Sequence, residues 1–349
     1  MKLAQYILIT ILICGIMISA CVSQAPKAPQ TSQVPQVTAM TTVKVAYQPT
    51  TSYAPLYIAE DEGFFAKQGI DVEFVKTAST ATALPLLVSG DAAVTGGALK
   101  IGVLNAVIKG EHVRIVADKG SLTPGSCTVY GFMVRKDLFD KGIVNNASDL
   151  KGRKIAVHDS DYDLYRVLAL GNLSSDDVET VEMEFPTVIP AFKNGAIDAG
   201  LVTEPFLTLS LKSGSAVILV PAQDFEPENP FPLYYGPAFL DKDPELGRRF
   251  MVAFLQGVKQ YNKGKTERNL EILVNYTHLD RDLLNQTCWW SITADGNVSK
   301  KPVREYIDWM YTNKKISWNM SEDQLFDMSY VTYANGVLRN TTSSGLQGE

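Results

Sequence analysis

The chain has 349 residues, of which 46% are hydrophobic and 20% charged, and its formal net charge is −6. This composition is typical of globular proteins, and the length allows two domains of about 100–200 residues each. The charge forms no basic stripe, so nucleic acid is not an expected partner. His112, His158 and His278 are far apart and no Cys/His spacing resembles a metal site, so we expect neither a metal nor a cofactor.

The first 20 residues have the layout of a secretory signal peptide. Lys2 precedes an apolar run at 6–18, which is shorter than the about 20 residues that a membrane span needs. The junction Ser19-Ala20-Cys21 resembles a lipobox, in which Cys21 becomes the lipidated first residue of the mature chain. A plain signal peptide or an uncleaved N-terminal anchor are the alternatives. Each of them places the body outside the cytoplasm, at the cell surface or in the periplasm.

Residues 21–42 are expected to form a lipid-anchored, disordered tether. The stretch 22–42 has three prolines, no aromatic residue and no periodicity. A flexible chain of this length reaches about 25 Å on average. The body would therefore stay near the membrane while tumbling freely.

Seven Asn-x-Ser/Thr sequences are a second indication of export. They are glycosylation acceptors only on exported chains, and the sequence does not decide whether they are used. They begin at Asn146, Asn172, Asn275, Asn285, Asn297, Asn319 and Asn340.

Strands and helices alternate through the first part of the body. The β-branched run 43–47 predicts a strand, and Ser52 and Pro55 favour a helix start after it. Further expected elements are a strand at 71–75, a helix at 81–89, a strand at 92–96, a helix at 98–110 and a strand at 113–117.

The alternation resumes after residue 150. Strands at 153–157, 180–185, 196–202 and 216–220 are expected, with helices at 161–171, 187–194 and 204–213. Such alternation predicts parallel sheets with helices on both faces.

Two irregular passages, 119–131 and 221–232, separate the alternating runs, and amphipathic helices follow from about 243. We therefore expect an α/β protein of two lobes that are joined by two hinge crossings and enclose a cleft. The expected segments are a signal peptide at 1–20, the tether at 21–42, a first lobe at 43–125 and 235–349, and a second lobe at 126–234.

Two cysteines, Cys127 and Cys288, remain in the body besides Cys14 in the signal peptide. In an oxidising compartment they could form a disulfide, but the sequence does not place their Cα atoms within the required distance of about 4.4–6.8 Å. Two buried free thiols are the favoured interpretation, and the disulfide is the alternative.

Several stretches in order resemble the nitrate/sulfonate/taurine and thiamine-precursor family of ABC-importer solute-binding proteins. The most specific is PLYIAEDEGFFAKQGIDVEFV at 55–75. The others are LVSGDAAVTGGA at 87–98, DLKGRKIAVHDSD at 149–161, AFKNGAIDAGLVTEPF at 191–206 and the return strand and helix that begin with FPLYYGPAF.

The resemblance implies a two-lobed type II periplasmic-binding fold with parallel-core sheets and a helical C-terminal tail. It also implies a monomer, not an enzyme, that captures a small polar solute in the cleft between the lobes. The solute would be of the nitrate, sulfonate, taurine or thiamine-precursor pyrimidine class. The protein would deliver it to an ABC permease with a separate cytoplasmic ATPase subunit.

Ligands of open α/β sheets bind outside the carboxyl ends of the strands. Four loops meet this condition, after the strands at 43–47, 92–96, 153–157 and 196–202. The ligand-binding residues expected in or next to these loops are Gln48, Thr51, Tyr53, Thr95, Gly96, Gly97, Asp159, Ser160, Tyr162 and Glu204.

These loops contain no Arg or Lys but three carboxylates, Asp159, Asp161 and Glu204. The composition favours a ring-bearing, amine-bearing or zwitterionic solute over nitrate or sulfate, with Glu204 and Tyr53 as the leading contacts. Capping or dipole stabilisation of helix N-termini is the alternative role of the carboxylates.

Two other functions stay open. One is an enzyme on the same fold, of the thiamine-pyrimidine or menaquinone-pathway type, although the export signal and the single cysteine in PGSCTVYG argue against it. The other is a ligand-sensing surface receptor. Neighbouring genes for a permease and an ATPase would distinguish an importer component from both.

Overall fold

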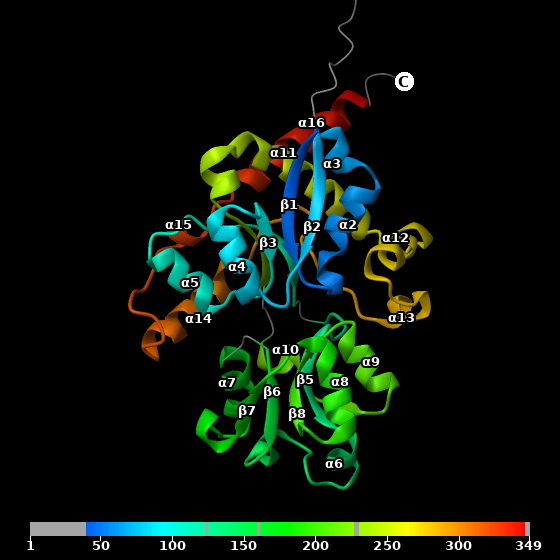
Figure 1. The fold of residues 1–349 in the computed structure, drawn as a ribbon, viewed down its shortest axis with the longest axis vertical. Helices are drawn as coiled ribbons and strands as arrows, with labels where there is room; N and C mark the ends of the chain where they lie inside the picture. The colour runs from blue at the N-terminus through cyan, green and yellow to red at the C-terminus, as the bar shows by residue number, and fades with distance from the viewer. Residues whose placement is uncertain (1–39, 123–124, 159–160, 227–229, 346–349) are drawn as a thin grey trace, which may run out of the picture. The chain divides into compact units, whose positions relative to one another are not determined.

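The computed structural model describes residues 40–122, 125–158, 161–226 and 230–345. The expected signal peptide, Cys21 and most of the tether lie outside the described residues, as do the two predicted loop residues Asp159 and Ser160. The described part forms two five-stranded sheets that are flanked by helices (Figure 1). Within these ranges no helix combines the length and the apolar character that crossing a bilayer requires.

The first sheet, with the helices packed on it, forms the first lobe. Its strands β1, β2 and β3 are parallel, whereas β10 pairs antiparallel with β3 on one side and β4 on the other. In sheet order the strands are β2 (Ile70–Lys76), β1 (Thr41–Tyr47), β3 (Val94–Gly96), β10 (Pro230–Tyr235) and β4 (Arg114–Ser121).

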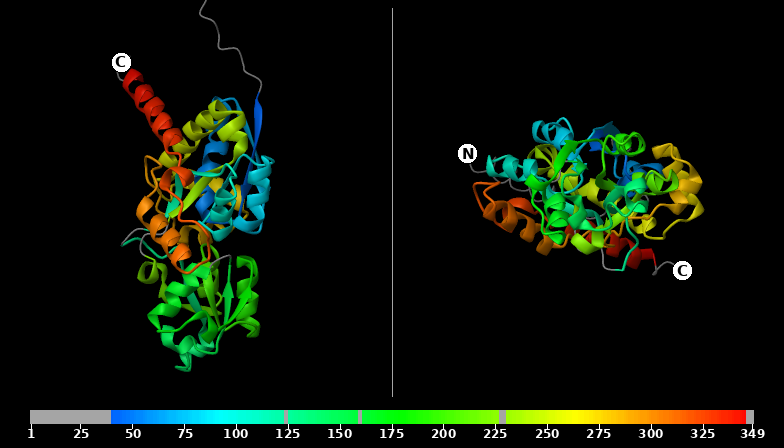
Figure 2. Two further views of the ribbon diagram at one scale, coloured as in Figure 1. Left: turned by 90° about the vertical axis from the view of Figure 1, so that its left-hand side faces the viewer. Right: turned by 90° about the horizontal axis from the view of Figure 1, so that it is seen from below.

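Alternating side chains bury both faces of this sheet. Leu233 and Tyr235 of β10 belong to the core beneath one set of helices, and Tyr234 belongs to the core on the opposite face. Helices α11 and α16 lie side by side on the first of these faces (Figures 1 and 2). That face carries α2 (Ala54–Asp61), α11 (Pro244–Tyr261), α12 (Glu267–Thr277) and α16 (Ser329–Gly345), and the opposite face carries α4 (Thr80–Ser89), α5 (Ile101–Ile108) and α14 (Lys300–Thr312).

The second sheet forms the second lobe in the same way. Phe132 and Val134 of its antiparallel strand β5 pack beneath α7 and α10, and Met133 of the same strand packs beneath α8 and α9. In sheet order the strands are β7 (Glu179–Glu182), β6 (Lys154–Val157), β8 (Ala199–Thr203), β5 (Tyr130–Arg135) and β9 (Ala216–Pro221), and the helices are α7 (Asp161–Leu170), α8 (Phe185–Asn194), α9 (Phe206–Lys212) and α10 (Ala222–Phe225).

Short helical segments complete the described chain. They lie mainly at the ends of strands and between the C-terminal helices. They are η1 (Thr51–Tyr53), α3 (Phe64–Lys67), α6 (Lys136–Asp140), η2 (Ala147–Leu150), η3 (Ser175–Asp177), η4 (Ala238–Lys242), α13 (Arg281–Gln286) and α15 (Glu322–Leu325).

Strands β5 and β10 begin in the passages expected to be irregular. Strand β5 was not predicted, whereas β10 coincides with the return strand that the resemblance implied at FPLYYGPAF. Each follows a passage between the sheets and pairs antiparallel with its neighbours, so neither sheet is purely parallel. The direction of the chain explains the antiparallel pairing. The parallel strands of each lobe end at the cleft, so a strand that begins at the cleft runs in the opposite direction. Strand β10 also begins at Pro230, which places 230–234 in the first sheet instead of in the expected second-lobe segment.

Cys127 and Cys288 form a disulfide with a Cα–Cα distance of 5.8 Å. The favoured interpretation of two free thiols is therefore wrong. The cysteines are 161 positions apart, and only the return of the chain after α13 to the passage between β4 and β5 brings them together.

Candidate functional site

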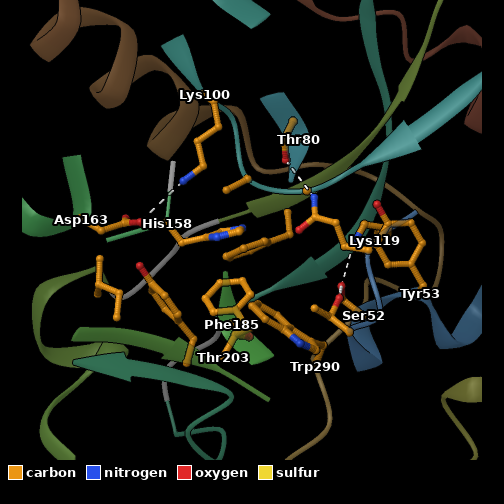
Figure 3. Close-up of a pocket in the computed structure, with 17 residues that line it drawn as sticks. Ser52, Tyr53, Thr80, Lys100, Lys119, His158, Asp163, Phe185, Thr203 and Trp290 are labelled. Atoms are coloured by element: carbon orange, nitrogen blue, oxygen red, sulfur yellow. Dashed lines mark hydrogen bonds and ion pairs between the residues drawn. The ribbon is translucent and has the colours of Figure 1, made fainter. Parts of the chain in front are cut away.

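A pocket lies between the two lobes (Figure 3). Strands β1, β3, β4, β6 and β8 all direct their carboxyl ends toward it, as expected for an open α/β fold. The first lobe contributes Gln48, Thr50, Ser52, Tyr53, Thr80, Gly97, Ala98, Lys100 and Lys119, the second lobe contributes Tyr130, His158, Asp163, Phe185, Leu201 and Thr203, and Phe231 and Trp290 complete the lining.

The loop after β1 builds the rigid first-lobe wall. The Tyr53 hydroxyl donates a hydrogen bond of 2.6 Å to the carbonyl oxygen of Gly96, and its side chain is buried. Gln48 Nε2 donates to Thr80 Oγ1 at 3.2 Å, which links this loop to the start of α4. Gly97 has a φ of +144°, and a Cβ there would lie 2.5 Å from Thr80 Oγ1. Glycine is therefore required at this point of the wall.

Lys119 of β4 is the central charged group of the pocket and has no exposed surface. Its Nζ donates to Ser52 Oγ at 2.7 Å and lies 4.2 Å from the centroid of the Tyr53 ring (Figure 3). Gly96 leaves room for the lysine stem, because a Cβ there would lie 2.3 Å from Lys119 Cε. Burial lowers the pKa of Lys119 to about 7, since the ammonium ion loses its hydration.

Among the described residues, no carboxylate forms an ion pair with Lys119. The adjacent Asp118 opposes the lowering of the lysine pKa only from a distance, because its carboxylate accepts hydrogen bonds from Gly120 N at 3.0 Å and Thr293 N at 2.8 Å. The ammonium group can therefore donate to a ligand.

The other end of the pocket holds an acidic cluster. Lys100 Nζ lies 4.0 Å from Asp163 Oδ2, and both residues are largely buried. Burial raises the pKa of Glu226, and the Asp163 carboxylate raises it further. Burial together with these two carboxylates also raises the pKa of Tyr130. The cation at this end is thus paired with protein carboxylate, unlike Lys119.

Aromatic rings form the wall between these two ends. Phe231 packs against Trp290 with a centroid distance of 4.3 Å, and Phe185 packs against the His158 ring at 4.0 Å. Tyr130 contacts Phe231 at 6.1 Å. The pocket can therefore hold an apolar or planar body next to a buried positive charge.

The structure brings only some of the predicted ligand-binding residues to this pocket. Gln48, Tyr53 and Gly97 line it, and Gly96 lies directly behind Tyr53 and Lys119. Thr51, Thr95, Tyr162 and Glu204 do not line it. Asp159 and Ser160 lie outside the described residues.

Three of the residues off the pocket have other contacts. Thr95 Oγ1 donates to the carbonyl oxygen of Ala46 at 2.9 Å and so joins β3 to β1. The Tyr162 ring packs against Tyr306 and Trp309 of α14, each with a centroid distance of 5.0 Å. Thr51 is buried within η1.

Glu204 has structural partners on two elements. Its carboxylate accepts hydrogen bonds from Thr208 N at 3.1 Å and Thr208 Oγ1 at 2.7 Å in α9, and from Cys288 N at 3.0 Å. Burial raises the pKa of this carboxyl group, while the hydrogen bonds oppose the rise. The alternative role weighed for Glu204 was stabilisation of the helix dipole. Its contacts with the first turn of α9 agree with that role and add a link to the segment at Cys288.

The four predicted loops contain no Lys or Arg, but the pocket does contain lysine, because Lys100 and Lys119 line it. The sequence predicted that the strand ends at 117, whereas β4 continues to Ser121 and carries Lys119 to the edge of the cleft. The rule on carboxyl ends of strands, applied to this strand as well, would have indicated Lys119. The same rule applies to Phe185, the last residue of the strand predicted at 180–185, whereas no local signal pointed to Trp290.

A family model described as NMT1/THI5 like matches residues 50–263. A Bacillus subtilis (strain 168) protein named for binding aliphatic sulfonates is 26% identical over 295 residues, which cover 81% of this chain and 85% of that protein. The matches confirm the resemblance found in the sequence.

Solved structures confirm the two-lobed fold. The alkanesulfonate-binding protein SsuA from Xanthomonas axonopodis pv. citri, bound to MOPS, matches with a TM-score of 0.66 and 18% identity over 81% of this chain and 96% of SsuA. The desulfurization enzyme DSZB matches with a TM-score of 0.64 and 15% identity over 84% of this chain and 99% of DSZB. At these identities the likeness extends to the fold alone.

Proposed function

We propose that this chain, which belongs to the NMT1/THI5-like family, is the extracytoplasmic solute-binding protein of an ABC importer. Support comes from the relative named for sulfonate binding and from the pocket between two lobes. In this function the monomer captures a solute between the lobes and delivers it to a permease that a separate ATPase subunit drives. All seven asparagines in Asn-x-Ser/Thr sequences are exposed, so they are accessible to glycosylation, which is compatible with a location outside the cytoplasm.

The solute that fits best is an organic anion with an apolar or planar body. The observation that carries this proposal is Lys119, a buried ammonium group in an aromatic pocket that forms no ion pair with any carboxylate of the part of the chain that the structure describes. A buried charge is costly unless it is paired, and an anionic head group would supply the pair. The aromatic wall would cover the body of the solute. This proposal replaces the preference for amines that the loop composition suggested.

A ligand panel on the soluble body tests the proposal. Benzenesulfonate, benzoate and butanesulfonate should raise the melting temperature, and at 100 times its Kd such a ligand adds about 2.7 kcal/mol of stability. Benzylamine, which has the same ring with the opposite charge, is the matched control and should have no effect. The proposal would be contradicted if none of the anions raised the melting temperature, or if benzylamine alone raised it.

Catalysis is the second candidate, because DSZB has the same fold. Both cysteines of the described body are joined in a disulfide, so neither is a thiolate nucleophile. Binding without chemistry therefore has more support. Chromatography of the panel ligands after prolonged incubation distinguishes the two, since a binding protein returns each ligand unchanged.

We further propose that the protein is anchored by a lipid on Cys21, which follows a small-residue junction and precedes a proline-rich stretch. Cys21→Ser should release the body from membranes into the soluble fraction, because a lipid chain supplies the anchor. Fractionation and immunoblotting of cells that express each form measure the effect. A variant that stays on the membrane as the parent does would indicate an uncleaved N-terminal helix instead.

A further inference from the structure

The segment 287–293, here called the strap, connects the two lobes a third time. At one end the disulfide to Cys127 and the hydrogen bond from Cys288 N to Glu204 Oε1 tie it to the second-lobe side. At the other end the strap bonds to Ser121 and Asp118, which lie on β4 of the first lobe. Ser121 N donates to the carbonyl oxygen of Ser291 at 2.8 Å, and Thr293 N donates to the carboxylate of Asp118. The strap is therefore held from both sides of the pocket.

Trp290 lies in the middle of the strap and forms part of the pocket wall. Its side chain is 3% exposed and packs on Phe231 and over Gly120, where a Cβ would come within 3.2 Å of the indole ring. Its indole Nε1 is buried and has no hydrogen-bond partner among the described residues. A buried donor of this kind is rare in native structures and calls for an acceptor.

We infer that Trp290 donates its indole N–H to the bound solute, and that the Cys127–Cys288 disulfide and Glu204 position it for this contact. The inference rests on the proposed function and adds a second donor to Lys119. Both groups are donors only, which matches a head group that only accepts, such as a sulfonate or carboxylate. Cys288 and Glu204 are positioning residues, since neither lines the pocket.

Trp290→Phe tests the donor, because phenylalanine keeps most of the packing and removes the N–H. The Kd for benzenesulfonate, measured by calorimetry, should rise roughly 10- to 150-fold, as expected for a lost hydrogen bond to a charged group. Trp289→Phe is the matched control. The Trp289 N–H already donates to the carbonyl oxygen of Leu284, and its ring stacks on Tyr261 away from the pocket, so the Kd should stay unchanged.

A double-mutant cycle tests the positioning. Replacement of both cysteines by serine should weaken benzenesulfonate binding in the parent protein and have no further effect in the Trp290→Phe background. An equal loss in both backgrounds would assign the disulfide a merely structural role and overturn the inference. If the cysteine variant does not fold, Glu204→Gln, which weakens the other anchor of the strap, provides the same cycle.

The outcomes separate this inference from the proposed function. A parent protein that binds none of the anions refutes the proposed function. A parent that binds benzenesulfonate, with an unchanged Kd after Trp290→Phe, refutes the inference and leaves the function standing.

Discussion

Lys119→Met is expected to weaken benzenesulfonate binding by about 2–5 kcal/mol, or roughly 30-fold to several thousand-fold, because it removes one partner of a buried charge pair. The stability of the unliganded protein should stay the same or increase. In that state the ammonium group is buried, donates to Ser52 and lies over the face of the Tyr53 ring. Replacing a buried, unpaired charge by an apolar side chain of similar length removes a desolvation cost.

The measurements are calorimetric titration for binding and thermal unfolding for stability. Lys44→Met is the matched control. The Lys44 side chain is 49% exposed on β1 of the same sheet and pairs with Glu73, so its loss should change neither quantity by much. A Lys119→Met protein that is well folded and binds benzenesulfonate as tightly as the parent would remove the basis of the anion assignment.

The affinity for the anion should depend on pH, with a plateau below about 7. Burial lowers the pKa of Lys119 from its ordinary value of 10.5 to about 7, so the free protein loses the ammonium proton above that pH. Binding an anion then requires the uptake of a proton. The Kd should rise by up to about tenfold for each pH unit above 7, until the pH reaches the higher pKa that Lys119 has in the complex.

The same group affects the unliganded stability with the opposite sign. Between about pH 7 and 10.5 the unfolded lysine holds a proton that the folded one has lost, so the contribution of Lys119 to the free energy of unfolding rises with pH.

Calorimetric titrations of benzenesulfonate in two buffers of different ionisation enthalpy, at pH 6, 7, 8 and 9, measure the proton uptake on binding. Lys119→Met should abolish it, and equal Kd values at pH 6 and 9 in the parent would contradict the role of the ammonium form.

Local sequence patterns were sufficient for most of the fold. The alternation of β-branched runs with helical spacing identified the strands at 43–47, 71–75 and 153–157, because the burial of a strand depends on the side chains of consecutive residues. The same logic located Gln48, Tyr53 and Gly97 at the pocket, since a residue just after a parallel strand lies at the ligand-binding edge wherever the rest of the chain goes.

Only the tertiary structure decided what depends on contacts between distant segments. The direction of β5 and β10 follows from the side on which the chain enters each sheet, and no local pattern records this. Cys127 and Cys288 pair across 161 positions, and Trp290 reaches the pocket from a C-terminal segment that the strap contacts hold in place. The charge of the site depends in the same way on the burial of Lys119, which forms no ion pair within the described ranges, whereas Glu204 faces α9 and Cys288. Such long-range packing is a property of the folded chain as a whole, and this is why the sequence predicted the cleft but misjudged the charge within it.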